Sequence, residues 1–314
     1  MLALLFPGQG SQEIGMAKDA CEVSVAARDV FASADTALGL PLSRLCFDGP
    51  EDALLRTEIQ QPAILTASIA LLRMLEERIA LEPSYLAGHS LGEYTALVAA
   101  GALDFEDAVR LVHARGRFMQ EAVPEGRGAM AAVMGCSAED VARACAYAVV
   151  KTGRVVGPAN LNGPNQTVIS GDAVAVEVAC ACALQEGAKR AIPLNVSAPF
   201  HCDLMAPAAE KLALDLARVR FRDVSAPVVT NVEARPCSEG ARFATLLEAQ
   251  VTAPVRFTEM VSCIAERGVR RVLEIGPGRV LTGLVACVAR GIERANLSSC
   301  ATLDEVVAFV AESA

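Results

Sequence analysis

The sequence has no tryptophan and only three histidines among its 314 residues. Aromatic residues make up 4% of the chain and hydrophobic residues 53%, so the core must be built mainly from aliphatic and alanine side chains. Charged residues reach 21%, which is close to the globular norm and excludes a disordered chain. Length and composition therefore predict a globular protein of about two domains, or of one large α/β domain.

The sequence also lacks an excess of positive charge. It holds 28 Lys and Arg against 37 Asp and Glu, which gives a net charge of −9 at pH 7. A protein that binds nucleic acid by neutralising its phosphates needs the opposite sign, so we expect no nucleic-acid partner. An acidic chain can still present a local basic patch to an acidic protein.

No apolar run reaches the ~18 residues that a membrane-spanning helix needs. The nearest candidate, residues 59–72, contains Gln60, Gln61 and Pro62 and stops at Arg73. The first residues, MLALLFPGQGSQ, include no basic residue, and their apolar run is too short for a secretory signal. We therefore expect a cytoplasmic protein with no membrane segment.

A disulfide framework is not indicated either, although the chain has eleven cysteines. Their number is odd, no C-x-x-C occurs, and the closest pair, Cys180 and Cys182, falls within one predicted helix. Free cysteine behaves as a small hydrophobic residue in Ala- and Val-rich helices. We expect reduced, mostly buried thiols in a reducing compartment.

Apolar strands followed by helices dominate the first part of the chain. Residues 2–6 predict a strand that ends at a Pro-Gly-Gln-Gly turn, and residues 85–87 predict a second strand. A helix is predicted over 91–100, closed by a glycine, and another to about residue 123. Asp104 is the predicted cap of that last helix, with Asp107 at capping-box spacing. This order is typical of α/β proteins.

The segment 126–196 has a different pattern. Its predicted order is β-α-β-β-α-β, which is that of a ferredoxin-like unit. Helices in it begin at the caps Ser137 and Asp172. After residue 196 the α/β pattern resumes. We therefore expect a small ferredoxin-like domain, residues 126–196, inserted into a larger α/β domain formed by residues 1–125 and 197–314.

One pentapeptide indicates a nucleophile. Gly88-His89-Ser90-Leu91-Gly92 matches G-x-S-x-G, with a predicted strand just before it and a helix just after it, as a nucleophile elbow requires. The small glycines let strand and helix approach closely, and the helix N-terminus faces any oxyanion formed there. We predict that Ser90 is the nucleophile. The alternative is an ordinary turn between a strand and a helix.

A serine nucleophile needs a base, and three histidines are available. His89 adjoins Ser90, where neighbouring side chains diverge, and His113 lies in the middle of a predicted helix. His201 lies where the inserted segment returns to the larger domain, and clefts form at domain junctions. His201 is therefore the predicted base, and a structural histidine is the alternative.

No acid for a Ser-His-Asp triad stands out. The aspartates that can be placed between Ser90 and His201 all cap predicted helices: Asp104, Asp107, Asp140 and Asp172. We therefore predict a dyad in which another acceptor orients the imidazole. Arg115, on the helix after the elbow, can pair a substrate carboxylate in bidentate fashion, and a solvated arginine is the alternative. A dinucleotide loop at Gly8-Gln9-Gly10 is excluded, because Glu13 stands where the third glycine belongs.

Several motifs together resemble one family. They are FPGQGSQ (6–12), Thr57 with QPA (61–63), GHSLGEY (88–94), RGRFMQ (115–120), NLNGPNQ-VISG (160–171), APFH (198–201), Gln250 and EIGPG (274–278). In this order they resemble malonyl-CoA:acyl-carrier-protein transacylases, over residues 6 to about 285. The resemblance implies an α/β-hydrolase-like core with a ferredoxin-like insertion. It also implies transfer of malonyl groups from malonyl-CoA to an acyl carrier protein, without a metal or a cofactor.

The resemblance also implies a role for each matching residue. Ser90 takes the malonyl group as an ester, and His201 is its base, oriented by the main-chain carbonyl of Gln250. Gln9 and Leu91 give backbone N–H groups to the oxyanion hole. The residues implied in substrate and partner binding are Arg115 for the malonate carboxylate, Gln61, Asn160, Asn162 and Phe200 for the substrate, and Lys189 and Arg190 for the carrier protein.

One departure concerns the pathway. Phe200 stands where many stand-alone bacterial members carry Ser and where malonyl-selective domains of polyketide synthases carry Phe. Fatty-acid synthesis, trans-acting polyketide loading and malonate decarboxylase share this chemistry, and the motifs do not separate them. A monomer is expected. The alternatives in other classes are a serine esterase or thioesterase, with an apolar pocket in place of Arg115, and a non-catalytic docking module with an altered Ser or His.

Overall fold

The computed structural model describes residues 1–124 and 126–312, so residue 125, the expected end of the first large-domain segment, lies outside the described residues. Its main sheet has the strand order β10-β9-β1-β2-β7-β8. These strands are β1 (Leu2–Phe6), β2 (Tyr85–Gly88), β7 (Val228–Val229), β8 (Pro236–Cys237), β9 (Arg271–Ile275) and β10 (Glu293–Leu297). All neighbours are parallel except β8, which pairs antiparallel with β7.

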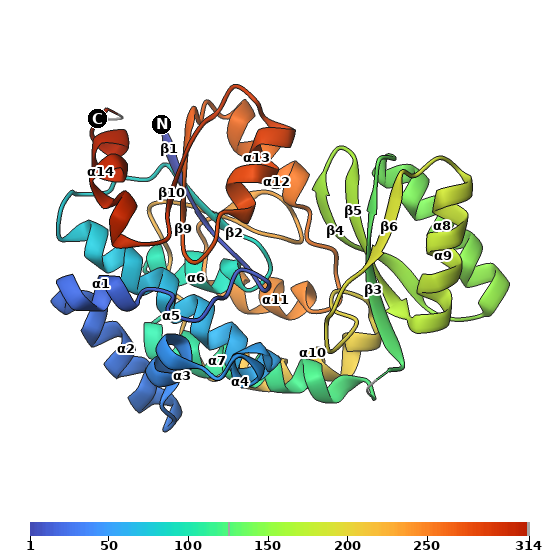
Figure 1. Cartoon of the computed structure of the whole chain (residues 1–314), viewed down its shortest axis with the longest axis horizontal. Helices are drawn as coiled ribbons and strands as arrows, with labels where there is room; N and C mark the ends of the chain where they lie inside the picture. Colours follow the sequence, from blue (N-terminus) through green and yellow to red (C-terminus); the bar gives the residue numbers. More distant parts are fainter. Residues whose placement is uncertain (125, 313–314) are drawn as a thin grey trace.

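Helices cover both faces of this sheet (Figure 1). The side chains of β1 show why, because they alternate between two buried faces. Leu2, Leu4 and Phe6 belong to one hydrophobic core, and Ala3 and Leu5 to another. A strand buried on both faces needs helices on both sides. The helices are α1 (Lys18–Val23), α2 (Val25–Leu38), α3 (Leu42–Asp48), α4 (Glu51–Leu55), α5 (Thr57–Glu76), α6 (Gly92–Ala99), α7 (Phe105–Ala122), α10 (Ala206–Leu216), α11 (Gly240–Gln250), α12 (Phe257–Glu266), α13 (Val280–Val288) and α14 (Leu303–Ala311).

A second sheet is antiparallel, with the order β4-β5-β3-β6. Its strands are β3 (Gly128–Met134), β4 (Val156–Gly163), β5 (Gln166–Asp172) and β6 (Arg190–Pro193), and the helices α8 (Ala138–Thr152) and α9 (Ala173–Gln185) cover one face. The predicted β-α-β-β-α-β order and the α/β fold class are confirmed.

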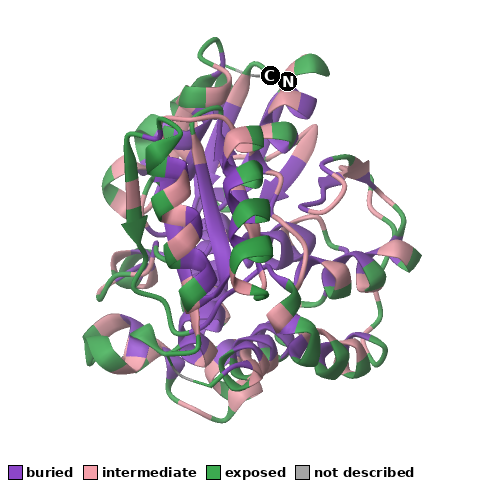
Figure 2. Cartoon of the chain, turned by 90° about the vertical axis from the view of Figure 1, so that its right-hand side faces the viewer, coloured by how far each residue is buried: buried purple, intermediate pink, exposed green. Residues whose placement is uncertain are grey.

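The two sheets share a boundary through β3 and β4. In β3, Ala131 and Val133 face the core under α8 and α9, whereas Met130 and Ala132 belong to the main core. Strand β4 is also tied to the segment before α12, because Val255 donates to the carbonyl of Ala159 (2.9 Å) and accepts from Leu161 N–H (2.8 Å). Buried residues fill the interior, and exposed ones lie on the outer helix faces (Figure 2).

The predicted capping of α7 is wrong. Asp104 stands at the N-cap position, but its side chain makes no hydrogen bond to the helix, and no capping box with Asp107 forms. Both carboxylate oxygens instead accept from Arg222 Nη2 at 2.6 Å. A guanidinium offers charge-assisted hydrogen bonds, which are stronger than those of a neutral N–H. Asp140 and Asp172 do cap α8 and α9, as predicted.

The cysteines are all free thiols. Five of them are buried, five are half-buried and Cys287 is exposed, so burial is less complete than predicted. Among the described residues, no helix combines the length and the apolar character needed to cross a membrane. No group of three or more His, Cys, Asp or Glu side chains in this part of the chain is arranged to hold a metal ion.

Candidate active site

The turn between β2 and α6 is a nucleophile elbow. Ser90 has φ = 52°, a left-handed conformation that costs a non-glycine residue on the order of 1–3 kcal/mol. The flanking glycines are required by close packing. A Cβ on Gly88 would lie 1.9 Å from the carbonyl of Gly92, and one on Gly92 would lie 2.1 Å from the carbonyl oxygen of Phe6. The turn therefore holds Ser90 at the C-terminal end of the parallel strands, where α/β proteins form their sites.

His201 lies beside this serine, with 2.7 Å between Ser90 Oγ and His201 Nε2. On its other side, His201 Nδ1 is 2.9 Å from the carbonyl oxygen of Gln250 and 3.1 Å from that of Ala253. A carbonyl oxygen only accepts hydrogen bonds, so Nδ1 carries the proton of the neutral imidazole. The lone pair of Nε2 therefore faces the Ser90 hydroxyl.

The environment keeps this imidazole uncharged. Burial lowers the pKa of His201 to about 3, and the nearby positive charge of Arg115 acts in the same direction. The hydrogen bonds to the two carbonyl groups oppose this shift only in part. His201 is thus ready to accept a proton at neutral pH.

Arg115 is buried on α7, and its side chain reaches Ser90. Its Nη2 donates to Ser90 Oγ (3.1 Å) and to Gln250 Oε1 (3.0 Å), and its Nη1 donates to Gln61 Oε1 (2.8 Å). Its Nε has no hydrogen-bond partner among the described residues. Burial lowers the pKa of the guanidinium, against which the charge of Glu93 acts. The site therefore contains a fixed cation with unused donor capacity next to the serine.

A cavity of about 820 Å³ opens onto Ser90 and His201. Its lining comes from strands of the smaller sheet, including Met130 of β3 and Asn160 of β4, and from the turns that follow main-sheet strands, including Gln9 after β1. The junction between the two sheets is thus the cleft expected at the return of the chain near His201.

Two backbone N–H groups near the serine are unused. Leu91 N–H lies at the start of α6, where helix N–H groups have no partner within the helix. Gln9 lies in the loop after β1 and lines the same cavity. Neither N–H donates to another residue in the part of the chain that the structure describes. Such donors can stabilise an oxyanion on an acyl group bound to Ser90.

The other predicted site residues lie at different distances from the cavity. Phe200 and Asn160 line it, whereas Gln61 is fully buried on α5 against Arg115. Asn162 is not among the residues that line the cavity; its Oδ1 lies 2.9 Å from His89 Nε2, and its assignment to the substrate stays a prediction.

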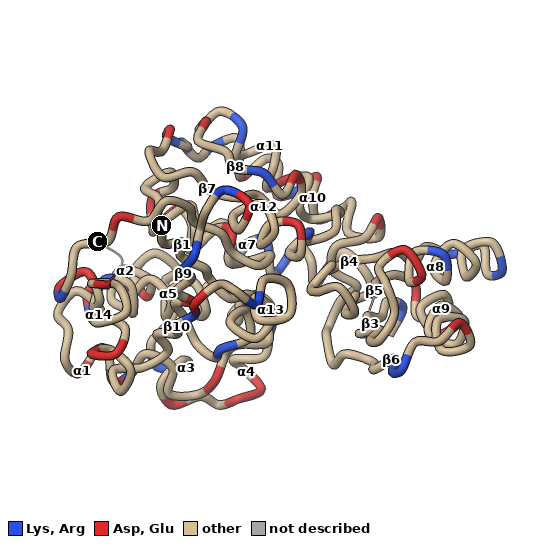
Figure 3. The backbone as a smooth tube through the Cα atoms, turned by 90° about the horizontal axis from the view of Figure 1, so that it is seen from above, with Lys and Arg blue, Asp and Glu red and all other residues tan. Residues whose placement is uncertain are grey.

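The predicted docking residues lie on the smaller sheet. Lys189 and Arg190 are exposed at the start of β6, and a basic segment is visible beside that strand in Figure 3. The cavity lining begins again at Leu194. Three residues of extended chain lie between Arg190 and Leu194, so the two are four steps apart, a distance of roughly 13 Å.

Two buried residues at the elbow were missed by the sequence analysis. Asn231 follows β7, the strand beside β2, and its side chain contacts the backbone of Ser90. Glu93 is the acid of the GHSLGEY motif, and it accepts a hydrogen bond from Asn231 N–H (3.0 Å). A signal was present for each: an acid in a nearly apolar helix, and a polar residue just after a buried parallel strand.

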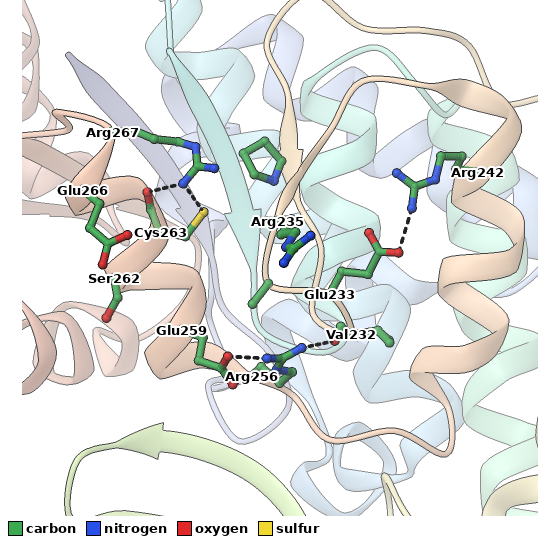
Figure 4. A pocket seen from close by; sticks show the side chains of 12 residues that line it. Val232, Glu233, Arg235, Arg242, Arg256, Glu259, Ser262, Cys263, Glu266 and Arg267 are labelled. Carbon is green, nitrogen blue, oxygen red and sulfur yellow. Dashed lines mark hydrogen bonds and ion pairs between the residues drawn. The ribbon is translucent and has the colours of Figure 1, made fainter.

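A second cavity, of about 770 Å³, lies around the β7–β8 turn and α12 (Figure 4). Many of its charged side chains bind one another or the main chain: Arg242 to Glu233 (2.7 Å), Arg256 to Glu259 (2.7 Å) and Arg267 to the carbonyl of Cys263 (3.0 Å). No histidine lines it. Ser262 and Cys263 do line it, so among the described residues it differs from the Ser90 site in having no histidine that could act as a base.

Comparison with known proteins gives the same assignment over the whole chain. Residues 3–306 match the family model described as acyl transferase domain. A malonyl CoA-acyl carrier protein transacylase of Escherichia coli strain K12 is 49% identical over 282 residues, covering 90% of this chain and 91% of that protein. The Bacillus subtilis strain 168 protein of the same name is 48% identical over 311 residues, covering 99% and 98%.

Solved structures agree in fold. An acyl carrier protein S-malonyltransferase from Vibrio cholerae has a TM-score of 0.94 at 44% identity and covers 97% of this chain and 99% of its own. A malonyl-transacylase in complex with a type II polyketide-synthase acyl-carrier protein has a TM-score of 0.95 at 45% identity, covering 98% and 99%. Matches of this extent, on a chain whose elbow serine faces a histidine, show that it belongs to the acyl transferase domain family.

Proposed function

We propose that this protein moves a malonyl group from malonyl-CoA to the phosphopantetheine thiol of an acyl carrier protein, through an ester on Ser90. The observation that carries the proposal is the buried guanidinium of Arg115, whose Nη2 lies 3.1 Å from Ser90 Oγ. A fixed positive charge at this place favours an acyl group that has its own carboxylate. The relatives are named as malonyl CoA-acyl carrier protein transacylases, in agreement with this chemistry.

The first half-reaction makes the acyl-enzyme. His201 Nε2 accepts the hydroxyl proton of Ser90 while Oγ attacks the thioester carbonyl of malonyl-CoA. The backbone N–H groups of Leu91 and Gln9 bind the resulting oxyanion, and Arg115 binds the malonyl carboxylate. When the tetrahedral intermediate collapses, the C–S bond breaks and His201 returns the proton to the sulfur of CoA.

The second half-reaction repeats these steps with the carrier protein. His201 takes the proton of the phosphopantetheine thiol, and the sulfur attacks the ester carbonyl on Ser90. The C–O bond then breaks, and the serine oxygen takes the proton back from His201. Every step moves a proton or an acyl group, so we propose that no cofactor takes part.

Two glutamines support the reacting groups. The main-chain carbonyl of Gln250 holds His201 in the tautomer that can accept the serine proton, a role that an aspartate has in the Ser-His-Asp triad. Gln61 binds Arg115 Nη1 and so orients the guanidinium toward the cavity. Asn160 and Phe200 line the cavity, and we assign them to substrate contact.

The remaining proposals concern the domains, the docking site, the oligomeric state and the location of the protein. We propose that residues 126–196 form a small domain inserted between 1–125 and 197–314, since the strands between Gly128 and Pro193 have their own sheet and core. We also propose that the carrier protein docks at Lys189 and Arg190 on this domain. All reacting groups come from one chain, so a monomer suffices. The free thiols are consistent with a cytoplasmic location.

Intact-mass measurement tests the function. Incubation with malonyl-CoA should add one malonyl group to the protein, and addition of a holo acyl carrier protein should remove it and malonylate the carrier. Ser90→Ala should form no adduct. A malonyl group mapped to Cys202, no adduct in the wild type, or release of free malonate instead of transfer would contradict the proposal. The last result would make the protein a thioesterase.

A further inference from the structure

The backbone of Ser90 is held by a side chain from the turn that follows β7, the strand beside β2 in the main sheet. Asn231 Oδ1 accepts from the backbone N–H of Ser90 at 2.6 Å, and Asn231 Nδ2 donates to the carbonyl of Gly88 at 2.7 Å. Asn231 is fully buried. One amide group thus bridges the last residue of β2 and the serine itself.

Glu93 connects this bridge to a second one. Its Oε2 accepts from Asn231 N–H (3.0 Å) and from Gln250 Nε2 (2.7 Å). Gln250 Nε2 also donates to the carbonyl oxygen of Ser90 at 3.1 Å. Both main-chain polar groups of Ser90 are therefore held by side chains, and Glu93, which is 1% exposed, joins the two holders.

This arrangement matters because Ser90 has a strained backbone. A left-handed conformation of a non-glycine residue persists only when its surroundings impose it. The position of Oγ relative to His201 Nε2 depends directly on that conformation. A shift of about 1 Å in a reacting group can cost roughly a hundredfold in rate.

We propose that Asn231 and Glu93 are positioning residues, which fix the Ser90 backbone so that its hydroxyl stays in line with His201. The inference rests on the function proposed above and adds to it. Neither residue lines the cavity at Ser90, so neither is assigned a contact with substrate. Their effect is therefore expected in the rate of acylation and not in the binding of malonyl-CoA.

The first test compares Asn231→Ala with the wild type in the malonylation half-reaction. For this step, kcat stands for the maximal rate of acylation and KM for the malonyl-CoA concentration that gives half of that rate. Removal of both hydrogen bonds should lower kcat by about 10- to 100-fold, while KM for malonyl-CoA stays within about threefold. Asn296→Ala is the matched control. Asn296 lies on β10, and its Nδ2 also donates to a main-chain carbonyl, that of Gly278 (2.9 Å). The control should keep the wild-type kcat.

The second test separates geometry from charge at Glu93. Glu93→Gln keeps an oxygen that can accept from both donors and loses the charge, whereas Glu93→Ala loses the acceptor. We expect the Gln variant to stay within about threefold of the wild-type kcat and the Ala variant to lose at least about tenfold. If Asn231→Ala fails to fold, the comparison of the two Glu93 variants still tests the positioning role.

The readout must exclude simple loss of folded enzyme. Rates are therefore divided by the burst amplitude, which counts the molecules that accept a malonyl group. A smaller amplitude at the wild-type rate per active molecule would overturn the inference, as would a loss confined to KM. Equal losses in both Glu93 variants would overturn it too, because they would assign an electrostatic role. If the wild type itself takes no malonyl group, the proposed function fails instead.

Discussion

At the scale of single residues, we expect Arg115 to decide which acyl group Ser90 can take. The guanidinium is buried, and it donates to neutral oxygens of Ser90, Gln61 and Gln250. Its Nε has no partner among the described residues. A carboxylate on the substrate supplies charged acceptors, whereas an acetyl group leaves the cation with neutral ones only. We therefore expect the preference for malonyl over acetyl to depend on this one buried cation.

Replacing this arginine should change the preference for substrates. Arg115→Ala should lower kcat/KM for malonyl-CoA at least about a hundredfold, because loss of one partner of a buried charge pair costs ~2–5 kcal/mol. The kcat/KM for acetyl-CoA should hold or rise, since no cation has to be left without a carboxylate. Arg117→Ala is the control: Arg117 is exposed on the same helix. Equal losses for both substrates would show that Arg115 is structural and that the carboxylate is bound elsewhere.

At the scale of elements, β4 joins the smaller sheet to the catalytic turn. Asn162, near its end, is bonded to His89 Nε2, and Thr258 of α12 donates to the carbonyl of Leu161 at 2.9 Å. Burial lowers the pKa of His89, so its ring is neutral and must satisfy its nitrogens by hydrogen bonds. The elbow and β4 therefore stabilise each other.

Removing the amide of Asn162 should destabilise the fold. Asn162→Ala leaves a ring nitrogen of the half-buried His89 without its protein partner, which costs about 1 kcal/mol. Urea unfolding should show a lower midpoint with an unaltered slope. The exposed Asn165, in the turn after β4, is the control, and Asn165→Ala should unfold as the wild type does. If both variants unfold alike, the His89 contact contributes nothing to stability.

These elements also show what a sequence can predict. The elbow was predictable because its strand, turn and helix are contiguous in the sequence and because two glycines indicate close packing between them. The partners of its polar groups were not, because Asn231 is 141 positions from Ser90 and lies in the turn after another strand, β7. The same holds for Asp104, whose partner Arg222 is 118 positions away. The two-residue strand β8 is too short to produce a hydrophobic pattern.

At the scale of the whole molecule, the free energy of unfolding depends on pH through two buried groups of the site, His201 and Glu93. Their contributions change with pH in opposite directions. The folded pKa of His201 lies below its unfolded value, so its contribution is present above pH ~6.5 and is lost as the pH falls toward 3. Burial raises the pKa of Glu93 to about 7, against the effect of its hydrogen bonds and of Arg115. Its contribution is present below pH ~4.5 and is lost as the pH rises through 7.

Glu93→Gln should remove the loss at alkaline pH, because the neutral amide has no charge to bury. The difference in unfolding free energy, variant minus wild type, should increase between pH 5 and pH 8, by up to roughly 3 kcal/mol. Urea midpoints at the two pH values measure it. Glu248→Gln changes an exposed acid on α11 and should give a difference that is flat with pH. A flat difference for Glu93→Gln would mean that its carboxylate titrates normally.

Recognition of the carrier protein also belongs to the whole molecule, because the net charge of −9 opposes it. Acyl carrier proteins are acidic, so binding requires a local cation pair, and Lys189 and Arg190 offer one on an exposed strand that leads to the cavity. Charge reversal of both to Glu should lower kcat/KM for the carrier about tenfold or more at low salt. It should also flatten the salt dependence, because the steering attraction is lost.

The two half-reactions separate docking from catalysis. Malonylation by malonyl-CoA involves no carrier protein, so the Lys189→Glu, Arg190→Glu variant should form the acyl-enzyme at close to the wild-type rate. Reversal of Arg218 and Arg220, which are exposed after α10, changes the net charge by the same amount and is the control. If the control weakens transfer equally, total charge governs the encounter and no docking site lies on β6. If both half-reactions slow together, the substitutions have disturbed the cleft, since β6 continues directly into its lining at Leu194.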